Sequence, residues 1–261
     1  MATPAAVRVW GSSFALYKRI WRSNVLGSFV QPLLYLLGMG VGVGSLVDAN
    51  GASTDILGGV DYVAFLAPAL LATTAMIVMS QESMWPVMDG FRWGSQYLAM
   101  AATPLRPADI VNGVTLWHAT RGFLAASGVA VVLALVPATR SWGLIPAVPF
   151  AVLTGLAFAG PITAWAASRE YSDQSFPAIM RFCIVPMFLF AGAFYPVTQL
   201  PGWLQVVAQC TPLYHGVELC RGSVLHTLGL AEACVHVVVL LAFWLTGLAV
   251  CRVMFTRRLA R

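Results

Sequence analysis

Residues 62–81 read YVAFLAPALLATTAMIVMSQ, and this stretch decides the fold because its 20 residues carry no charge. A helix needs about 20 apolar residues to cross a bilayer core of roughly 30 Å. Three other stretches are equally free of charge: residues 25–47, 142–168 and 233–251. A soluble domain of this length needs polar residues over its surface, so the sequence predicts an all-α membrane protein with several spans.

The composition supports the same class of protein, with 59% hydrophobic and 10% charged residues. The formal net charge is +5, but no basic patch is interleaved with exposed aromatic residues, so no nucleic-acid partner is expected. We interpret the positive charge as the signal that orients the protein in the membrane.

The apolar stretches and their flanks predict six transmembrane helices in a single domain covering residues 1–261. These spans are expected at about 25–47, 62–83, 110–136, 142–167, 176–196 and 229–251. In the first span, Gly38/Gly42 and Gly40/Gly44 have GxxxG spacing, which favours close approach of a neighbouring helix.

Three segments outside the spans have their own character. Residues 7–22 alternate aromatic and cationic positions at helical spacing, which predicts an N-terminal amphipathic helix in the membrane interface. Residues 85–108 form a polar, partly helical segment. Residues 197–225 contain two helices too short to cross and poor in charge, which predicts a re-entrant helical hairpin before the last span.

The lysines and arginines are distributed unequally between the two sides of this topology. Twelve lie on the side of both termini and two on the other. The twelve are Arg8, Lys18, Arg19, Arg22, Arg92, Arg106, Arg169, Arg181, Arg252, Arg257, Arg258 and Arg261, and the two are Arg140 and Arg221. The bias predicts that both termini and residues 85–108 are cytoplasmic.

Enzyme signatures are absent from the sequence. Lys18 is the only lysine and no GxxxxGK[ST] loop exists, so any ATP energy must come from another polypeptide. His215 and Glu218 have HxxE spacing, for which a hydrogen-bonded structural pair is favoured over a metal site. No catalytic or metal-binding residues are predicted. A disulfide between Cys210 and Cys220 is left open.

Ionisable groups inside spans are candidates for function. His118 and Arg121 share one face of the third predicted span. They could line a substrate path, or they could make interhelical hydrogen bonds and snorkel to the interface. The same alternatives apply to Glu232 and His236 near the outer end of the last span.

Four segments, in order along the chain, carry a resemblance to a known family. They are QPLLYLLGMG at 31–40, YVAFLAP at 62–68, ATPLRPADI at 102–110 and TPLYHGVELCRG at 211–222. The chain resembles the membrane subunit of type-2 ABC exporters, in the branch with lipo-oligosaccharide (nodulation-factor) exporters and daunorubicin-type drug-resistance permeases. Two departures stand out: Ala69 replaces a frequent glycine, and Gln96 and Tyr97 stand where many members have a glutamate.

The resemblance implies a division of labour. Residues 7–22 would be a connecting helix, 85–108 a coupling segment for the ATPase and 197–225 the extracellular hairpin. It implies two ATP-binding subunits that bind ATP and Mg, a second permease copy or paralogue, and no cofactor on this chain. It also implies outward transport of a drug or lipid-linked glycan across a bacterial inner membrane. The implied coupling residues are Arg92, Gln96, Tyr97, Pro104 and Arg106, and the implied re-entrant motif is Pro212, His215, Glu218 and Arg221.

Two other classes of membrane protein stay open. An ion-coupled secondary transporter would need internal repeats or carboxylates at mid-membrane. A polytopic membrane enzyme would need clustered catalytic groups, for which His215, Glu218 and Arg221 are the only candidates. Neither the substrate nor the choice between homodimer and heterodimer can be predicted.

Overall fold

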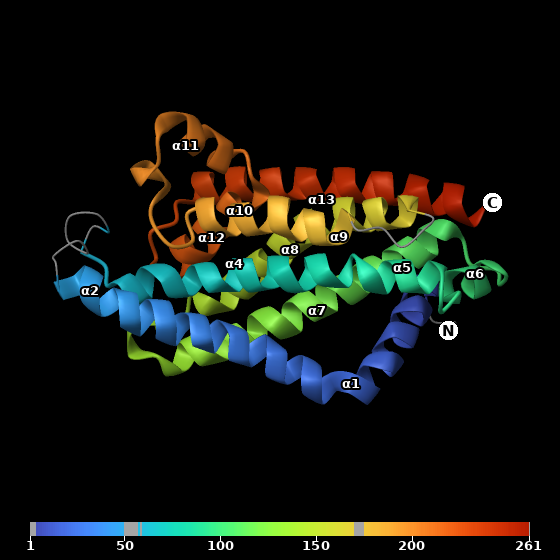
Figure 1. Cartoon of the computed structure of the whole chain (residues 1–261), viewed down its shortest axis with the longest axis horizontal. Helices are drawn as coiled ribbons and strands as arrows, with labels where there is room; N and C mark the ends of the chain where they lie inside the picture. Colours follow the sequence, from blue (N-terminus) through green and yellow to red (C-terminus); the bar gives the residue numbers. More distant parts are fainter. Residues whose placement is uncertain (1–3, 50–56, 58, 170–174, 261) are drawn as a thin grey trace.

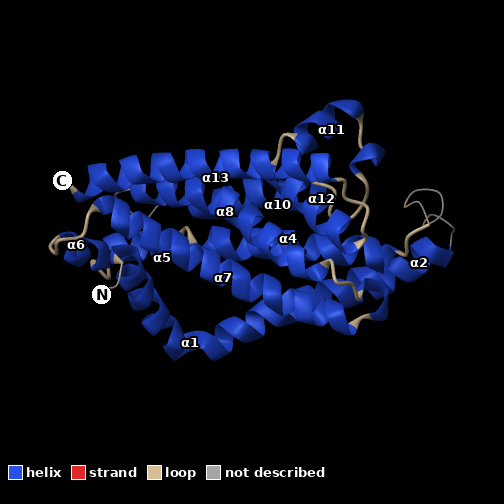
Figure 2. Cartoon of the chain, turned by 180° about the vertical axis from the view of Figure 1, so that it is seen from behind, coloured by secondary structure: helices blue, strands red, loops and turns tan. Residues whose placement is uncertain are grey.

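The computed structural model describes residues 4–49, 57, 59–169 and 175–260. Every regular element in these ranges is a helix (Figure 2). The N-terminal third contains α1 (Ala5–Tyr35), η1 (Leu36–Val43), α2 (Gly44–Ala49), α4 (Tyr62–Glu82), α5 (Trp85–Phe91) and α6 (Gln96–Ala101). The middle contains α7 (Pro107–Leu135), η2 (Pro137–Thr139) and α8 (Leu144–Ser168). The remainder contains α9 (Ser175–Ile179), η3 (Met180–Ile184), α10 (Val185–Phe190), η4 (Val197–Gln199), α11 (Gly202–Gln209), α12 (Pro212–Val224) and α13 (Leu230–Leu259).

Four helical stretches are long and apolar enough to cross a membrane: Tyr62–Phe91, Pro107–Leu135, Leu144–Ser168 and Leu230–Leu259. Two shorter apolar helices occupy Leu33–Val47 and Ser175–Phe190. The chain is therefore an all-helical, multi-pass membrane protein. The first and fifth of the six expected spans correspond to these two shorter helices, so a count of six stays a prediction.

The sequence predicted two separate helices at the beginning of the chain, an interfacial helix at 7–22 and a first span at 25–47. The structure differs from this prediction. The structure has one helix, α1, from Ala5 to Tyr35, and it continues through the π-helical η1 into α2. Figure 1 shows that α1 bends instead of breaking. No glycine or proline stands between Trp21 and Val25, so nothing in the sequence ends the helix there.

The fifth predicted span is shorter than expected, because α10 ends at Phe190 and not at residue 196. Gly192 has φ +83°, a conformation that ends a helix and favours glycine. The last helix is longer than the predicted span, since α13 continues to Leu259 instead of ending at residue 251.

Helix α4 lies at the centre of the bundle and contacts α7, α8 and α12. Its close packing depends on glycines in its neighbours. Met79 fits against Gly122 of α7 and Gly155 of α8, where an added Cβ would collide with the Met79 sulfur. Small residues allow this approach between helices that gain little from hydrophobic burial in a bilayer.

Of the two glycine pairs with GxxxG spacing in η1 and α2, one contacts a neighbouring helix of the chain. A Cβ built at Gly40 would lie 3.5 Å from Val63 Cγ2, and one at Gly44 would lie 3.4 Å from the Tyr62 ring, both on α4. Gly38 and Gly42 face open space among the described residues.

Different helices lie at the two ends of the bundle (Figure 1). The beginning of α1, the end of α13, α5 and α6 lie at one end, which we call the coupling end. Helices α2 and α11 lie at the other. Both ends of the chain are therefore on the same side of the molecule.

Candidate functional site

The coupling end is built around α5 and α6, the two short helices that follow α4. Tyr97 on α6 is buried, with its ring centroid 4.8 Å from that of Phe91 on α5 and 5.4 Å from that of Phe255 on α13. A Cβ at Gly90 would lie 2.5 Å from the Tyr97 ring, so glycine is required there. Burial raises the pKa of Tyr97 well above its usual range, so the phenol stays neutral. These contacts fix α6 to α5 and α13.

The exposed face of this segment combines cations with apolar side chains. Trp93 is 60% exposed and Leu98 is 47% exposed. The Arg92 guanidinium lies 5.5 Å from the centroid of the Trp93 ring. Pro104 and Arg106 are exposed in the turn that leads to α7, where the Arg106 backbone N–H donates to Asp109 Oδ2 at 3.1 Å.

The predicted coupling residues therefore divide into two groups. Arg92, Pro104 and Arg106 are on the surface, where another protein could touch them. Tyr97 is an internal anchor. Gln96 points to α1, where its Nε2 donates to Ser12 Oγ at 3.0 Å. Trp93 and Leu98 also belong to the exposed group, although neither was predicted from the sequence.

The first half of α1 connects α6 to the bundle. Trp10 Nε1 donates to Thr120 Oγ1 on α7 at 2.9 Å. Nearby, Val9 sits directly against Gly113 of α7, and a Cβ at Gly113 would collide with the Val9 side chain. Since Gln96 binds the same part of α1, a displacement of α6 would reach α7 through α1.

Arg121 forms a buried node between α4, α7 and α1. Its Nε lies 2.7 Å from Oε1 of Glu82 on α4, with side chains 6% and 19% exposed. Trp117 Nε1 donates to the other carboxylate oxygen at 3.3 Å. The Tyr17 ring on α1 lies 4.8 Å below the Arg121 guanidinium and 5.5 Å from the Trp117 ring. The interhelical interaction, one of the two interpretations offered for Arg121, is present, and a role of Arg121 in a substrate path stays a prediction.

His118 is buried one turn from Arg121, beside a small internal cavity. The cavity holds about 10 Å³, room for a single water molecule and not for a substrate. Among the described residues, Thr163 Oγ1 and Trp244 Nε1 are buried without a hydrogen-bond partner, and both side chains line this cavity. The role of His118 in a substrate path stays a prediction.

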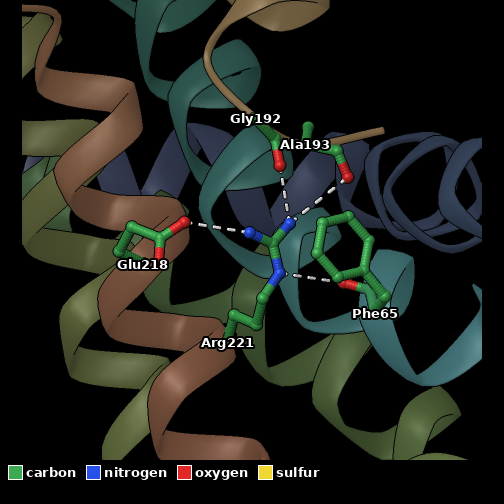
Figure 3. Close-up of polar contacts among 5 residues, drawn as sticks. All are labelled: Phe65, Gly192, Ala193, Glu218 and Arg221. Carbon is green, nitrogen blue, oxygen red and sulfur yellow. Dashed lines mark hydrogen bonds and ion pairs between the residues drawn. The ribbon is translucent and has the colours of Figure 1, made fainter. Parts of the chain in front are cut away.

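Arg221 organises the opposite end of the bundle (Figure 3). Its guanidinium donates from Nε to Phe65 O at 3.2 Å, from Nη1 to Glu218 Oε1 at 3.0 Å and from Nη2 to Gly192 O at 2.6 Å. Its Cζ lies 3.7 Å from the centroid of the Phe65 ring. One side chain of α12 thus holds α4 and the turn after α10 together.

The expected hydrogen bond between His215 and Glu218 is not the arrangement found. Glu218 pairs with Arg221, because opposite charges at i,i+3 attract more strongly than a carboxylate and a neutral imidazole. His215 faces α13 instead, with its Nδ1 2.7 Å from Nδ1 of His236. Pro212 begins α12, and Thr211 caps it by accepting from the Tyr214 N–H at 3.4 Å.

The described cysteines are free thiols, so Cys210 and Cys220 do not form the disulfide that the sequence left open. Cys220 is buried, and burial raises its thiol pKa to about 12, which keeps it unreactive. Within residues 4–49, 57, 59–169 and 175–260, no group of three or more His, Cys, Asp or Glu side chains could hold a metal ion.

Glu82 was not among the residues predicted from the sequence, and Arg221 was predicted without its backbone partners. Glu82 lies inside the second predicted span (62–83), and an acid at the depth of an arginine on a neighbouring span is a usable signal. The backbone oxygens of Phe65 and Gly192 carry no side-chain signal, so the sequence could not indicate these two partners of Arg221.

Comparisons with known proteins identify the family of the chain. A model of the ABC-2 type transporter family matches residues 6–225. Nodulation protein J of Rhizobium leguminosarum bv. viciae is 33% identical over 256 residues, which cover 97% of this chain and 94% of that protein. Nodulation protein J of Rhizobium leguminosarum bv. trifolii is 34% identical over 259 residues, covering 98% and 94% of the two chains. Nodulation protein J of Rhizobium meliloti (strain 1021) is 35% identical over 218 residues, covering 82% and 79%. This chain belongs to the ABC-2 type transporter family.

Proposed function

We propose that this chain is the transmembrane permease subunit of an ATP-binding cassette exporter driven by two copies of a separate ATP-binding subunit. The observation that carries the proposal is the coupling end, where Trp93 and Leu98 are exposed between Arg92 and Arg106. Exposed aromatic residues flanked by arginines are typical of protein–protein contacts. The groove on the partner would be apolar with an acidic rim.

A mechanical path supports the same role. Gln96 binds Ser12 of α1, Trp10 of α1 binds Thr120 of α7, and the Arg121 node joins α7 to α4. Closure of the two ATP-binding subunits on ATP would shift α6, and these contacts would carry the shift into the bundle. This chain would bind no cofactor, and ATP and Mg would be bound by the partner.

Six spans with both termini on the inner face of a bacterial inner membrane are part of the proposal. In the predicted topology, twelve of the fifteen lysines and arginines fall on the side of both termini, as the positive-inside rule requires of a cytoplasmic side. The shorter helices Leu33–Val47 and Ser175–Phe190 would be the first and fifth spans. Helices α11 and α12 would form the outer re-entrant hairpin, held by Arg221.

The substrate would be amphipathic or hydrophobic, such as a drug or a lipid-linked glycan. The resemblance to lipo-oligosaccharide exporters and the similarity to Nodulation protein J support a glycan carrying an acyl chain. Two permease chains, identical or paralogous, would enclose the path between them.

Reconstitution tests the proposal. The chain is co-expressed with the ATP-binding protein encoded beside it and placed in proteoliposomes with an acylated oligosaccharide. We expect a stable complex and transport that requires ATP hydrolysis, with both lost when Trp93 and Leu98 are changed to Ala together. Transport without hydrolysis that collapses with the proton gradient would identify an ion-coupled secondary transporter instead.

A further inference from the structure

The small cavity beside His118 lies where α7, α8 and α13 meet. Its volume of about 10 Å³ matches one water molecule. Most of its lining is apolar, but each of the three helices also contributes a polar side chain. These polar side chains are Thr115 and His118 of α7, Thr163 of α8 and Trp244 of α13. The cavity therefore collects polar groups inside an otherwise apolar bundle.

Two of these polar groups have no hydrogen-bond partner in the described part of the protein. They are Thr163 Oγ1 and Trp244 Nε1, and both atoms are buried. Thr163 is only 3% exposed, and Trp244 lies near the middle of α13, where lipid hydrocarbon could not supply a partner. An unpaired polar group is costly in such a place. The two groups are complementary, because the indole N–H donates and a hydroxyl both donates and accepts.

Close contact between α8 and α13 keeps the cavity open. A Cβ built at Gly160 would lie 3.1 Å from the backbone carbonyl carbon of Gly247, and a Cβ at Gly247 would collide with Pro161. The two backbones thus already touch about one turn away from Thr163 and Trp244. The helices cannot move closer to fill the space or to bring the two polar atoms together.

We propose that this cavity binds one water molecule, which accepts a hydrogen bond from Trp244 Nε1 and donates one to Thr163 Oγ1. These two partners meet the minimum that a buried water needs. The water joins α8 to α13 inside the bundle, and it satisfies both polar groups without any movement of the helices. Its binding depends neither on an ATP-binding partner nor on the orientation of the chain in the membrane.

The chemistry of the lining favours water over an ion. None of the described residues that line the cavity is Asp, Glu, Lys or Arg, so an ion would be buried without a neutralising charge. The indole of Trp244 can only donate, so it offers no ligand to a cation. A volume of about 10 Å³ excludes larger polar molecules.

Radiolytic footprinting of the purified full chain in detergent tests the proposal. X-ray pulses convert water to hydroxyl radicals in place, and the radicals oxidise the nearest reactive side chain, which mass spectrometry then locates. Cys251 lines the cavity and is 2% exposed, whereas Cys220 is 0% exposed and does not line it. We expect Cys251 to be oxidised several-fold faster than Cys220. Equally slow oxidation of the two thiols would show that the cavity is dry.

One variant and its control test the partner on α8. Thr163→Val keeps the shape of the side chain and removes the hydroxyl. Oxidation of Cys251 should fall to the rate of Cys220, and the melting temperature should fall by roughly 3 °C because Trp244 Nε1 loses its partner. Thr73→Val is the control, because Thr73 is 1% exposed and its Oγ1 donates to Ala69 O at 3.0 Å within its own helix. It should change neither quantity.

Trp244→Phe removes the partner on α13 and completes a double-mutant cycle. The double variant Thr163→Val/Trp244→Phe should melt close to Trp244→Phe alone, because the water is already lost in the single variant. Additive effects would mean that the two side chains share no water. Thr163→Val that melts at or above the parent protein, or that leaves the oxidation of Cys251 unchanged, would also overturn the proposal.

Discussion

Arg121 Nε lies 2.7 Å from Glu82 Oε1, and this ion pair joins α7 to α4 where Tyr17 of α1 packs against the same guanidinium. The pair is a salt bridge between two helices that are both long enough to span a membrane. It therefore connects the three helices that the coupling end would have to move together.

Breaking this pair should destabilise the protein strongly. Arg121→Gln leaves Glu82 buried without its cation, which should cost roughly 3 kcal/mol. Glu82→Gln should have a similar effect for the same reason. The double variant should be less destabilised than the sum of the two, because neither charge is then left alone. Melting temperatures of the four proteins in detergent measure the coupling, and additive effects would show that the pair does not act as a unit.

The contact between α1 and α7 depends on the absence of a side chain at Gly113. Gly113→Ala places a methyl group against Val9 and should cost roughly 1 to 3 kcal/mol by forcing α1 away from α7. Gly11→Ala is the matched control, because no described atom lies within 4 Å of the added methyl group. The melting temperature should fall for the first variant only. Equal behaviour of the two variants would contradict the packing of α1 on α7.

Replacement of Arg221 should loosen the end opposite the coupling end. Arg221→Lys keeps the charge, but a single ammonium cannot reach Phe65 O, Glu218 and Gly192 O with the geometry of the guanidinium. A loss of roughly 2 kcal/mol is expected from the unpaired buried carbonyls. Arg140→Lys, at an exposed position, should stay within about 0.5 kcal/mol of the parent protein. Hydrogen exchange should also become faster in residues 191–196. Unchanged exchange there would contradict the role of Arg221 in holding this turn.

The contact between His215 and His236 should make stability depend on pH. Burial, and then the neighbouring His236, hold the pKa of His215 below its ordinary value of 6.5. A histidine with a lowered folded-state pKa favours the folded state when neutral, so stability is fully present above pH 6.5 and is lost as the pH falls through the folded-state pKa. Melting temperature measured from pH 8 to pH 5 should fall in the parent protein.

His215→Gln should flatten that pH dependence, because the titrating contact with α13 is gone. His226→Asn is the control, since the contact of His226 is with Ser141 Oγ on the connection between α7 and α8 and not with His215 or His236. If the pH dependence persists in His215→Gln and disappears in His226→Asn, the effect comes from His226 and the prediction for His215 is wrong.

The sequence predicted the helical class and most helix positions because hydrocarbon imposes a length and a polarity on every crossing segment. Residues 62–83 and 142–167 match α4 and α8 within two residues at each end. The predicted end of the fifth span was wrong, because α10 ends where Gly192 adopts a positive φ. A glycine permits this φ but does not require it.

The candidate site was predictable only in part. The resemblance implied Arg92 and Arg106 as coupling residues, and charge counting placed both on the side of the termini, since charge is visible in the sequence. It could not separate exposed Trp93 from buried Tyr97, because the two aromatic residues differ only in which helix they meet. The ion pair of Arg121 could not be predicted, because it requires Glu82 to lie at the same depth on another helix. The sequence separation of the two residues does not reveal that depth.

The central claim is that the α5–α6 surface contacts an ATP-binding subunit, and photo-crosslinking from two exposed tryptophan positions tests it most directly. A benzoylphenylalanine is placed at Trp93, 60% exposed in the turn between α5 and α6, or at Trp142, 84% exposed in the connection between η2 and α8. Cells that also express the adjacent ATP-binding protein are irradiated. The account predicts a covalent product with the ATP-binding subunit from position 93 and none from position 142. No product from position 93, or the same product from position 142, would contradict it.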